Sequence, residues 1–455
     1  MHGACTLKNA HDVTDVGVFR LNGGHLVRAK RVVAELLAEA SNDVHAKRLA
    51  AVVDVVEAMT FAKHLTLTSI GRAMRGRTSA RHNIKKADRL LGNWRLHREV
   101  VLFYRTLARR LVRANTRAIV LIDWTQIHGD YWALTASVPF LGRSIPILSR
   151  THLAHEIGAR TAHAAFLADL KKVLPEGSKP VLVADGGFRS PFFNACEDAQ
   201  FHYVIRLRND RALARFGLYK GAEDYEEPRF GELFERATEK AQCLGIGRPY
   251  ARSRNSINVR MVLGPRPPKA DRKKKYADDY ERKRACEPVL IATNLENDAA
   301  ESIVRIYAAR MQIEETFRDT KSPRFGWGLD YTKTRSTRRF DVLLMLAALA
   351  TAAVALIGAA ARELGHESKY RARSGKAVVL SVFTLGTLIA AAPRRLAMRF
   401  STVWRQWKKA RLINREFLPD IPPPKSERRL VRFPLSHDLF CADHGWNGAV
   451  WGWPP

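Results

Sequence analysis

Four polar side chains recur at helical spacing between residues 307 and 321. They are Tyr307, Arg310, Glu314 and Lys321. Intervals of three, four and seven residues put them on one face of an α-helix. Such a face suits a phosphodiester, because a carboxylate can bind a metal ion at the reacting phosphate while the other groups contact neighbouring phosphates. A surface helix with paired charges has the same pattern and is the ordinary explanation for the segment taken alone.

Two aspartates follow short apolar segments that are predicted to be strands. Asp123 follows residues 118–122, and Asp185 follows residues 180–184. Ligands bind at strand ends in α/β sheets, although a single aspartate there is more often a turn or cap residue. Together with Glu314 the two aspartates make three carboxylates, the minimum set for holding two divalent ions through hard oxygen ligands. We therefore expect two Mg²⁺ ions, with Mn²⁺ as the alternative metal, and phosphoryl displacement as the reaction.

The charge balance indicates a polyanionic partner. Lysine and arginine number 76 against 45 acidic residues, which gives a formal net charge of +31 and a sequence pI near 10.4. Basic side chains that displace counterions supply most non-specific DNA affinity, so double-stranded DNA is the first expectation and a membrane surface the alternative. The five cysteines are scattered and form no CxxC pair, which fits a reducing cytoplasm. The first residues contain no apolar segment behind a basic start, so no secretory signal is predicted.

One apolar segment is long enough to span a membrane. Residues 342–361 contain no charged side chain, and about twenty apolar residues can cross a bilayer as a helix. The segment is rich in alanine, lacks aromatic belts and begins beside the charged residues 333–341. We therefore predict a buried core helix and no association with a membrane.

Residues 1–115 have the apolar spacing of helices and include one basic stretch. Its basic side chains recur at every fourth position: Arg77, Arg81, Lys85 and Arg89. They are predicted to project from one helical face, which suits a DNA groove or backbone. A solvated surface helix has the same pattern, and the segment itself does not decide between the two interpretations.

The pattern changes from helices to strands near residue 116. Strands are predicted at residues 118–122, 132–138, 145–148, 180–184 and 203–207, and helices at residues 162–173 and 188–199. This order predicts an α/β fold with a mixed sheet of the ribonuclease-H-like type. Residues 211–284 interrupt it with a predicted strand at 257–263 and basic runs at 272–275 and 282–284, for which a DNA-facing subdomain and a mobile loop are both open.

The segment that contains Tyr307 reads Y-x2-R-x3-E-x6-K and resembles the YREK signature of bacterial insertion-sequence DDE transposases of the IS-four family. Further segments are similar to those of Tn-ten-type transposases: HNIKKADRLLGN (82–93), VLIDWT (120–125), VADGGF (183–188), ATNL (292–295) and RMQIEETFRDTKSPRFGWGL (310–329). The likeness covers roughly residues 25–400, and its last block is highly specific.

This resemblance implies a role for each residue of the motif. Asp123, Asp185 and Glu314 would be the catalytic metal ligands, and Tyr307, Arg310 and Lys321 would bind phosphates near the element end. The family enzymes nick the end, form and reopen a DNA hairpin, and join the end to target DNA. The implied partners are terminal inverted repeats, target DNA, a second copy of the chain in the synaptic complex and, as a further candidate, a host DNA-bending protein.

The resemblance and the pattern changes together suggest five regions. They are a helical DNA-end-binding region at 1–115, a ribonuclease-H-like catalytic domain at 116–210 and 285–335, an inserted β-rich basic subdomain at 211–284, a C-terminal helical region for synapsis at 336–420, and a poorly ordered tail at 421–455.

One departure concerns base flipping. Members of the family that the chain resembles commonly carry a tryptophan where this chain has Val289, and that tryptophan stacks on a base flipped out during hairpin formation. Trp124 and Trp327 are the alternative aromatic residues. Two rival functions are a structure-specific nuclease on the same fold, without strand transfer, and a DNA-binding protein without catalysis.

Overall fold

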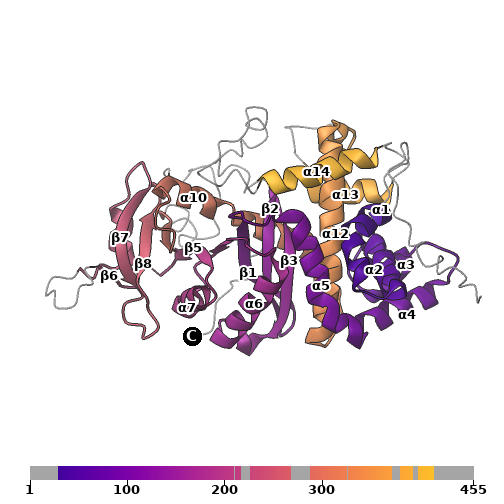
Figure 1. Ribbon diagram of the computed structural model, residues 1–455, viewed down its shortest axis with the longest axis horizontal. Helices are drawn as coiled ribbons and strands as arrows, with labels where there is room; N and C mark the ends of the chain where they lie inside the picture. Colours follow the sequence, from indigo (N-terminus) through magenta and orange to yellow (C-terminus); the bar gives the residue numbers. More distant parts are fainter. Residues whose placement is uncertain are drawn as a thin grey trace, which may run out of the picture.

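The computed structural model describes most of the chain. The described residues are 29–209, 211–216, 226–267, 287–324, 326–370, 380–392 and 398–413. The basic runs 272–275 and 282–284 and the tail 421–455 lie outside them. Figure 1 shows the N-terminal helices at one end, a sheet that extends to the other end, and the long helix α12 (Thr337–Glu363) beside the N-terminal helices.

The N-terminal part of the described chain is helical, as predicted. Its α-helices are α1 (Ala29–Leu36), α2 (Ala46–Met59), α3 (Leu67–Ala73), α4 (Ala80–Leu91) and α5 (Trp94–Leu111). Polar side chains satisfy backbone N–H groups at several of their starts. Thr66 accepts a hydrogen bond from the N–H of Ser69 in α3, and Asn93 accepts from the first N–H groups of α5.

The structure corrects one member of the predicted basic face. Helix α4 begins at Ala80, so Arg77 lies in the loop before it. That loop contains Gly76 with φ of +133°, and Ser79 has the extended conformation of an N-cap residue. The remaining basic residues lie on the helix and are exposed: Arg81, Lys85 and Arg89.

Nine strands of the described chain form one sheet in the order β3-β2-β1-β4-β5-β9-β8-β7-β6. The strands are β1 (Ile119–His128), β2 (Tyr131–Phe140), β3 (Arg143–Leu153), β4 (Val181–Ala184), β5 (His202–Leu207), β6 (Ala214–Phe216), β7 (Gln242–Pro249), β8 (Val259–Leu263) and β9 (Leu290–Thr293). Strands β1, β2 and β3 form an antiparallel meander, and β1, β4 and β5 are parallel. The sheet is therefore mixed and the fold is α/β and ribonuclease-H-like, as predicted.

Helices cover both faces of this sheet: α6 (Arg160–Val173), α7 (Ser190–Asp198), α10 (Ala300–Ala308) and α11 (Met311–Lys321). Alternate residues of a strand point to opposite faces. In β1, Val120 and Ile122 join the core that contains Phe166 of α6. Ile119 and Leu121 join the second core, which includes apolar side chains of α10 and α11. The sheet thus holds α10 and α11 on one face and α6 and α7 on the other.

Strands β6 to β8 continue the same sheet beyond the core. β5 pairs with β9, β9 with β8, β8 with β7 and β7 with β6, all antiparallel. The sequence pattern predicted β8 alone of the three inserted strands. The three residues of β6 are too few to show a period, and Gly245 and Gly247 interrupt the pattern of β7. A short helix, α8 (Phe230–Glu235), lies between β6 and β7.

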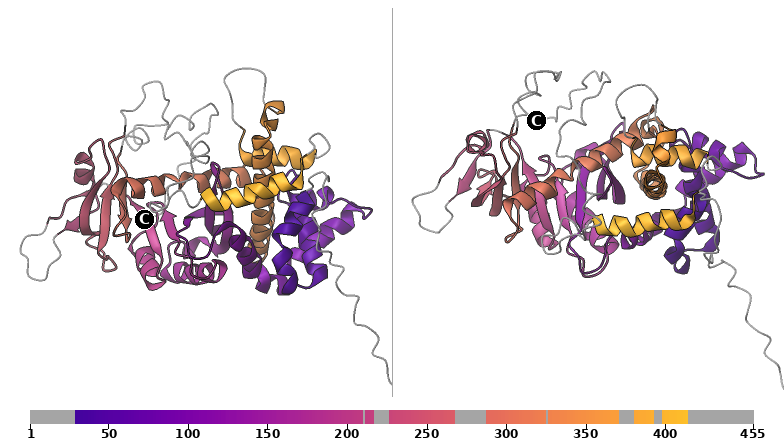
Figure 2. Two further views of the ribbon diagram at one scale, coloured as in Figure 1. Left: turned by 45° about the horizontal axis from the view of Figure 1, so that its top comes forward. Right: turned by 90° about the horizontal axis from the view of Figure 1, so that it is seen from above.

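Helix α12 is a buried core helix, as predicted. Residues 342–361 are all buried, and the right panel of Figure 2 views α12 almost end-on, with α13 (Val382–Ala391), α14 (Phe400–Ile413) and the N-terminal helices around it. A Cβ atom on Gly358 would lie 1.8 Å from the carbonyl oxygen of Val382, so glycine allows the backbones of α12 and α13 to touch. Among the described helices, α12 alone is long and apolar enough to cross a membrane, and its apolar stretch is wholly covered by protein.

Candidate active site

Asp123 and Asp185 lie where two central parallel strands separate. The last paired residues of β1 and β4 are Ile122 and Ala184, and each aspartate is the next residue along the chain. Strand β1 then continues to His128 through its pairing with β2. The sequence pattern predicted Asp123 at a strand end, but the residue lies inside the strand. The position is still the carboxyl edge of a parallel pair, where ligands bind in α/β sheets.

The carboxyl group of Asp123 is close to two other carboxylates. It accepts a hydrogen bond from the N–H of Trp124 at 2.8 Å, and its side chain is 16% exposed. Burial raises the pKa of Asp123 to about 8, with a further rise from the negative charges of Asp185 and Glu314 and an opposing effect of Arg310. The fold therefore brings the three predicted carboxylates within electrostatic reach of one another.

Asp185 begins the turn that joins β4 to α7. Its carboxylate accepts a hydrogen bond from the N–H of Gly187 at 2.8 Å and lies 3.6 Å from Nη1 of Arg208, which follows β5. A Cβ atom on Gly186 would lie 2.4 Å from Cγ of Arg208. The glycine therefore leaves room for Arg208 to lie against the turn and beside Asp185.

Residues 307–321 form two helices and not the single helix that the spacing predicted. α10 ends at Ala308 and α11 begins at Met311. Between them the N–H of Arg310 donates to the carbonyl of Tyr307, and the N–H of Ile313 donates to the carbonyl of Arg310. These bonds reach back three residues, which tightens the turn as in a 3₁₀-helix. No glycine or proline marks this turn, so the residue pattern contains no signal for it.

Arg310 lies between the carboxylates despite this break. Its Nη2 donates to Oε1 of Glu314 at 2.6 Å, and its Nη1 lies 3.6 Å from Oδ2 of Asp123. Its guanidinium carbon lies 6.0 Å from the ring centroid of Tyr307, which is also buried. Burial lowers the pKa of Arg310, but Tyr307 and the carboxylates raise it more, so the pKa is raised and the group stays charged.

The guanidinium of Arg310 has two donors without a hydrogen-bond partner. The residue is 6% exposed, and its Nε and Nη1 have no hydrogen-bond partner among the described residues. Buried donors without partners are unfavourable unless a ligand satisfies them. Phosphate oxygens accept charge-assisted hydrogen bonds from guanidinium nitrogens. The arrangement therefore suits a DNA phosphate next to Asp123.

Lys321, at the end of α11, faces the same part of β1. Its Nζ donates to Oγ1 of Thr125 at 3.4 Å, and Thr125 shares a face of β1 with Asp123 because the two are separated by one residue. Burial lowers the pKa of Lys321, and the nearby Asp330 partly offsets that effect. The predicted set of four residues therefore gathers around β1, although it comes from two helices.

The donor set fits Mg²⁺ or Mn²⁺. Asp123, Asp185 and Glu314 offer hard carboxylate oxygens, which both metals prefer. A divalent cation beside Asp123 would stabilise its negative charge and so offset the effects of burial and charge repulsion that raise the pKa of this group. In the described part of the chain no three His, Cys, Asp or Glu side chains are already arranged around one ion position. The guanidinium of Arg310 lies between two of the three carboxylates instead.

The family comparison addresses the same region of the chain. The family model described as the transposase DDE domain matches residues 116–352, which include Asp123, Asp185 and Glu314. The chain belongs to this family. A comparison with curated proteins gave no match. The protein is therefore a DDE transposase, an enzyme that binds and cleaves DNA, and DDE transposases generally use divalent metal ions.

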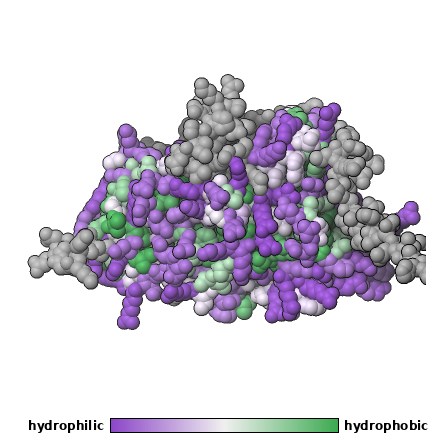
Figure 3. Space-filling model, viewed as in Figure 1, coloured by the Kyte–Doolittle hydropathy of each residue, from purple (hydrophilic) through white to green (hydrophobic). Residues whose placement is uncertain are grey.

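The basic residues of α4 in this DDE transposase lie apart from the three carboxylates. Figure 1 places α4 beyond α5 and α12 when viewed from β1. The surface over these N-terminal helices is largely hydrophilic in Figure 3. A cavity of about 300 Å³ lies between α2 and α4, lined in part by Arg48, Lys86 and Arg89. The structure therefore offers α4 as a separate basic surface.

The rings of the two tryptophans considered in place of Val289 pack into the cores of the DDE transposase. Trp124 points to the sheet face opposite Asp123, where its ring centroid lies 5.2 Å from that of His152. Trp327 is 3% exposed, with its ring edge-on to Phe383. Both residues therefore serve the cores of the protein.

Two residues near Asp185 were missed by the sequence interpretation. Arg208 lies beside its carboxylate, and the hydroxyl of Tyr250 donates to the carbonyl of Arg208 at 3.2 Å. Burial raises the pKa of Tyr250, and Arg189 and Asp185 are among the charges close enough to act on it. Tyr250 follows β7, so the inserted strands supply a side chain to the candidate site. The VADGGF segment could have pointed to a close neighbour, because paired glycines often permit a close contact.

Proposed function

We propose that this DDE transposase is an IS-four-family enzyme of the Tn-ten type that moves an insertion sequence by cut and paste. In this proposal Asp123, Asp185 and Glu314 hold two Mg²⁺ ions, with Mn²⁺ as an alternative. The main support is the buried guanidinium of Arg310, which has unsatisfied donors and lies between two of the three carboxylates. One point in the fold thus offers donors for a phosphate and oxygens for a metal.

In this proposal the side chains around β1 have different roles at the scissile phosphate. Bound divalent ions would lower the pKa of the attacking water or 3′-hydroxyl and neutralise the leaving oxygen. Arg310 would donate from Nε or Nη1, which point to different sides of the guanidinium, to a phosphate oxygen and help to fix its orientation. Lys321 would act as a point charge on a neighbouring phosphate, and the phenol of Tyr307 would lie behind Arg310.

The proposed reaction has four steps at one site: end nicking by water, hairpin formation by the freed 3′-hydroxyl, hairpin opening, and strand transfer to target DNA. The terminal inverted repeats would contact α4 through Arg81, Lys85 and Arg89, with Arg77 in the adjoining loop. The C-terminal helices would support a homodimer in the synaptic complex. A host DNA-bending protein is a further proposed partner, and the proposed location is the cytoplasm.

A structure-specific nuclease without strand transfer is the alternative function. The observation that favours it is Val289, because valine offers no stacking face for a flipped base and neither Trp124 nor Trp327 replaces one. The proposal instead requires that another contact supports hairpin formation.

A gel assay with paired element ends and Mg²⁺ separates the two functions. Cut-and-paste transposition predicts nicked, hairpin and joined products in sequence, whereas the nuclease alternative predicts nicked or cut ends alone. Asp123→Ala is expected to retain DNA binding and lose every product. Equal products from wild type and Asp123→Ala would refute catalysis by this site.

A further inference from the structure

The two-residue loop of the hairpin between β2 and β3 has a backbone conformation that is uncommon for its residues. Phe140 pairs with Arg143, which leaves a two-residue loop. Leu141 has φ of +50° and Gly142 has φ of +82°. Positive φ at both loop positions is typical of a tight hairpin turn, but a bulky residue is rarely found there. Such strain persists where surrounding contacts over-determine it.

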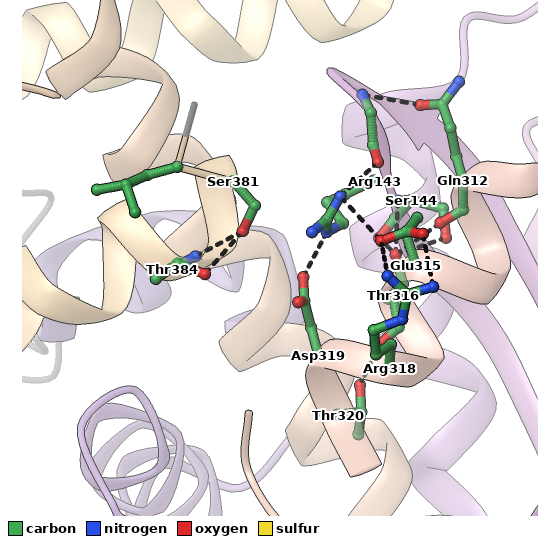
Figure 4. A network of polar contacts seen from close by, with 12 residues as sticks. Arg143, Ser144, Gln312, Glu315, Thr316, Arg318, Asp319, Thr320, Ser381 and Thr384 are labelled. Carbon is green, nitrogen blue, oxygen red and sulfur yellow. Dashed lines mark hydrogen bonds and ion pairs between the residues drawn. The ribbon is translucent and has the colours of Figure 1, made fainter. Parts of the chain in front are cut away.

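Those surrounding contacts come from α11. Figure 4 shows the polar network between the hairpin and this helix. The N–H of Gly142 donates to Oε1 of Gln312 at 3.1 Å. Nε of Arg143 donates to Oδ2 of Asp319 at 2.5 Å, and its Nη1 lies 3.5 Å from Glu315. Three successive turns of α11 are therefore bonded to the hairpin.

The next residue of the hairpin completes the network in the interior. The N–H of Ser144 donates to Oγ1 of Thr316 at 2.7 Å, and the hydroxyl of Thr316 is also within 3.1 Å of the Ser144 carbonyl. Ser144 is 0% exposed and Thr316 is 2% exposed. Buried hydrogen bonds of this kind fix a geometry, because breaking one leaves a group without a partner.

The network contacts α11 on the face opposite Glu314 and Lys321. At 3.6 residues per turn, Gln312, Thr316 and Asp319 share one face of the helix. Glu314 and Lys321 lie on the opposite face, towards Arg310 and Thr125. A rotation or shift of α11 would therefore move the carboxylate of Glu314 relative to the two aspartates on the sheet.

We propose that residues 141–144, here termed the hairpin clamp, hold α11 in the register that directs Glu314 towards Asp123 and Asp185, with Arg143 as the main positioning residue. The inference rests on the proposed function, in which Glu314 is a metal ligand. Outer contacts that orient metal ligands typically change metal affinity or activity about 10- to 100-fold when they are removed. The hairpin clamp acts in the same way through a helix.

The same strand supplies a matched control. Arg150 of β3 also pairs with a buried-side aspartate: its Nη2 lies 2.6 Å from Oδ2 of Asp169 on α6. The side chains of Arg143 and Arg150 are 20% and 21% exposed, so the two arginines are similar in burial. Arg150 has no contact with α11 among those that the structure describes.

The experiment compares Arg143→Gln with Arg150→Gln in the full-length protein. Three quantities are measured: binding of end DNA without metal, single-turnover cleavage as a function of Mg²⁺ concentration, and hydrogen exchange of the α11 amides in metal-free protein. For Arg143→Gln we expect unchanged DNA binding, about tenfold more Mg²⁺ for half-maximal cleavage, and faster exchange in α11. For Arg150→Gln we expect wild-type Mg²⁺ dependence and wild-type exchange in α11.

Two additional variants separate the possible failures. Gln312→Met removes the α11 acceptor that binds the N–H of Gly142 in the hairpin clamp, and it should shift the Mg²⁺ dependence in the same direction even if Arg143→Gln does not fold. Glu314→Gln tests the proposed function: wild-type cleavage by this variant would overturn the function itself. If Glu314→Gln is inactive but Arg143→Gln and Gln312→Met behave like wild type or like Arg150→Gln, the hairpin clamp is refuted and the proposed function stands.

Discussion

Replacing Asp123 by asparagine should stabilise the metal-free protein at alkaline pH. The amide side chain would keep the shape of the carboxyl group but would carry no charge to bury. The pKa of Asp123 is raised from 3.8 to about 8, so the folded protein holds this proton more tightly than the unfolded chain does. The stability that the proton contributes is complete below pH ~4 and is lost as pH rises through about 8.

The magnitude follows from the pH interval. The interval from pH 5.5 to the pKa of about 8 spans about 2.5 pH units. At 1.36 kcal/mol per unit, the wild type therefore loses about 3 kcal/mol of stability between pH 5.5 and pH 9. The Asp123→Asn variant lacks this loss, so its advantage over wild type should grow by about 3 kcal/mol across the interval.

The assay is thermal or urea unfolding with a chelator at pH 5.5 and pH 9. Asp169→Asn is the control. Asp169 pairs with Arg150 at a distance of 2.6 Å, and this pair is separate from the three carboxylates. This control should lower the free energy of unfolding at both pH values. The reasoning is refuted if Asp123→Asn differs from wild type by the same amount at pH 5.5 and pH 9.

Three further predictions concern single contacts. Gly186→Ala should slow end cleavage about tenfold, because the new methyl would displace Arg208, whose Cγ lies 2.4 Å from the added Cβ position; single-turnover kinetics would show it. Gly358→Ala should lower the free energy of unfolding by about 2–3 kcal/mol in urea titrations, because its Cβ would overlap the backbone of α13. Lys321→Met should weaken end binding and reduce its salt dependence by about one counterion, whereas Glu314→Gln should retain binding and lose cleavage. Filter binding at several salt concentrations distinguishes the two variants. Identical defects in both would contradict the separate roles of Lys321 and Glu314.

The sequence predicted the core of the fold because its strands are short, apolar and bounded by turn residues. The strands at 180–184 and 203–207 and the helix at 162–173 agree with β4, β5 and α6 to within one or two residues. Residues 342–361 were recognised as a core helix from their alanine content. These features depend on local pattern, which a single sequence carries.

The candidate site was harder to predict because tertiary contacts decide its details. Strand β1 continues past Asp123 because β2 pairs with it, although Asp123 and Gln126 are polar. The turn at Arg310 carries no breaker residue, and the side chain of Arg310 there contacts Asp123 and Glu314. Long-range neighbours of this kind have no signature in the spacing of residues along the chain.

Arg208 and Arg143 illustrate the same limit. Arg208 reaches Asp185 from another strand, and Arg143 reaches Asp319 across 176 positions of sequence. Each is an ordinary arginine in a chain with 76 basic residues, so neither composition nor periodicity distinguishes it. The fold identifies them because it shows which carboxylates they approach.

The most direct test of the account is metal rescue at the three carboxylates. Asp123→Cys, Asp185→Cys and Glu314→Cys would each be assayed on end DNA with Mg²⁺ and with Mn²⁺. Thiolate is a poor ligand for Mg²⁺ and a better one for Mn²⁺, so each variant should bind DNA, fail to cleave it with Mg²⁺ and recover part of its cleavage with Mn²⁺. Wild-type cleavage with Mg²⁺ by any of the three variants would contradict the assignment of that residue as a metal ligand.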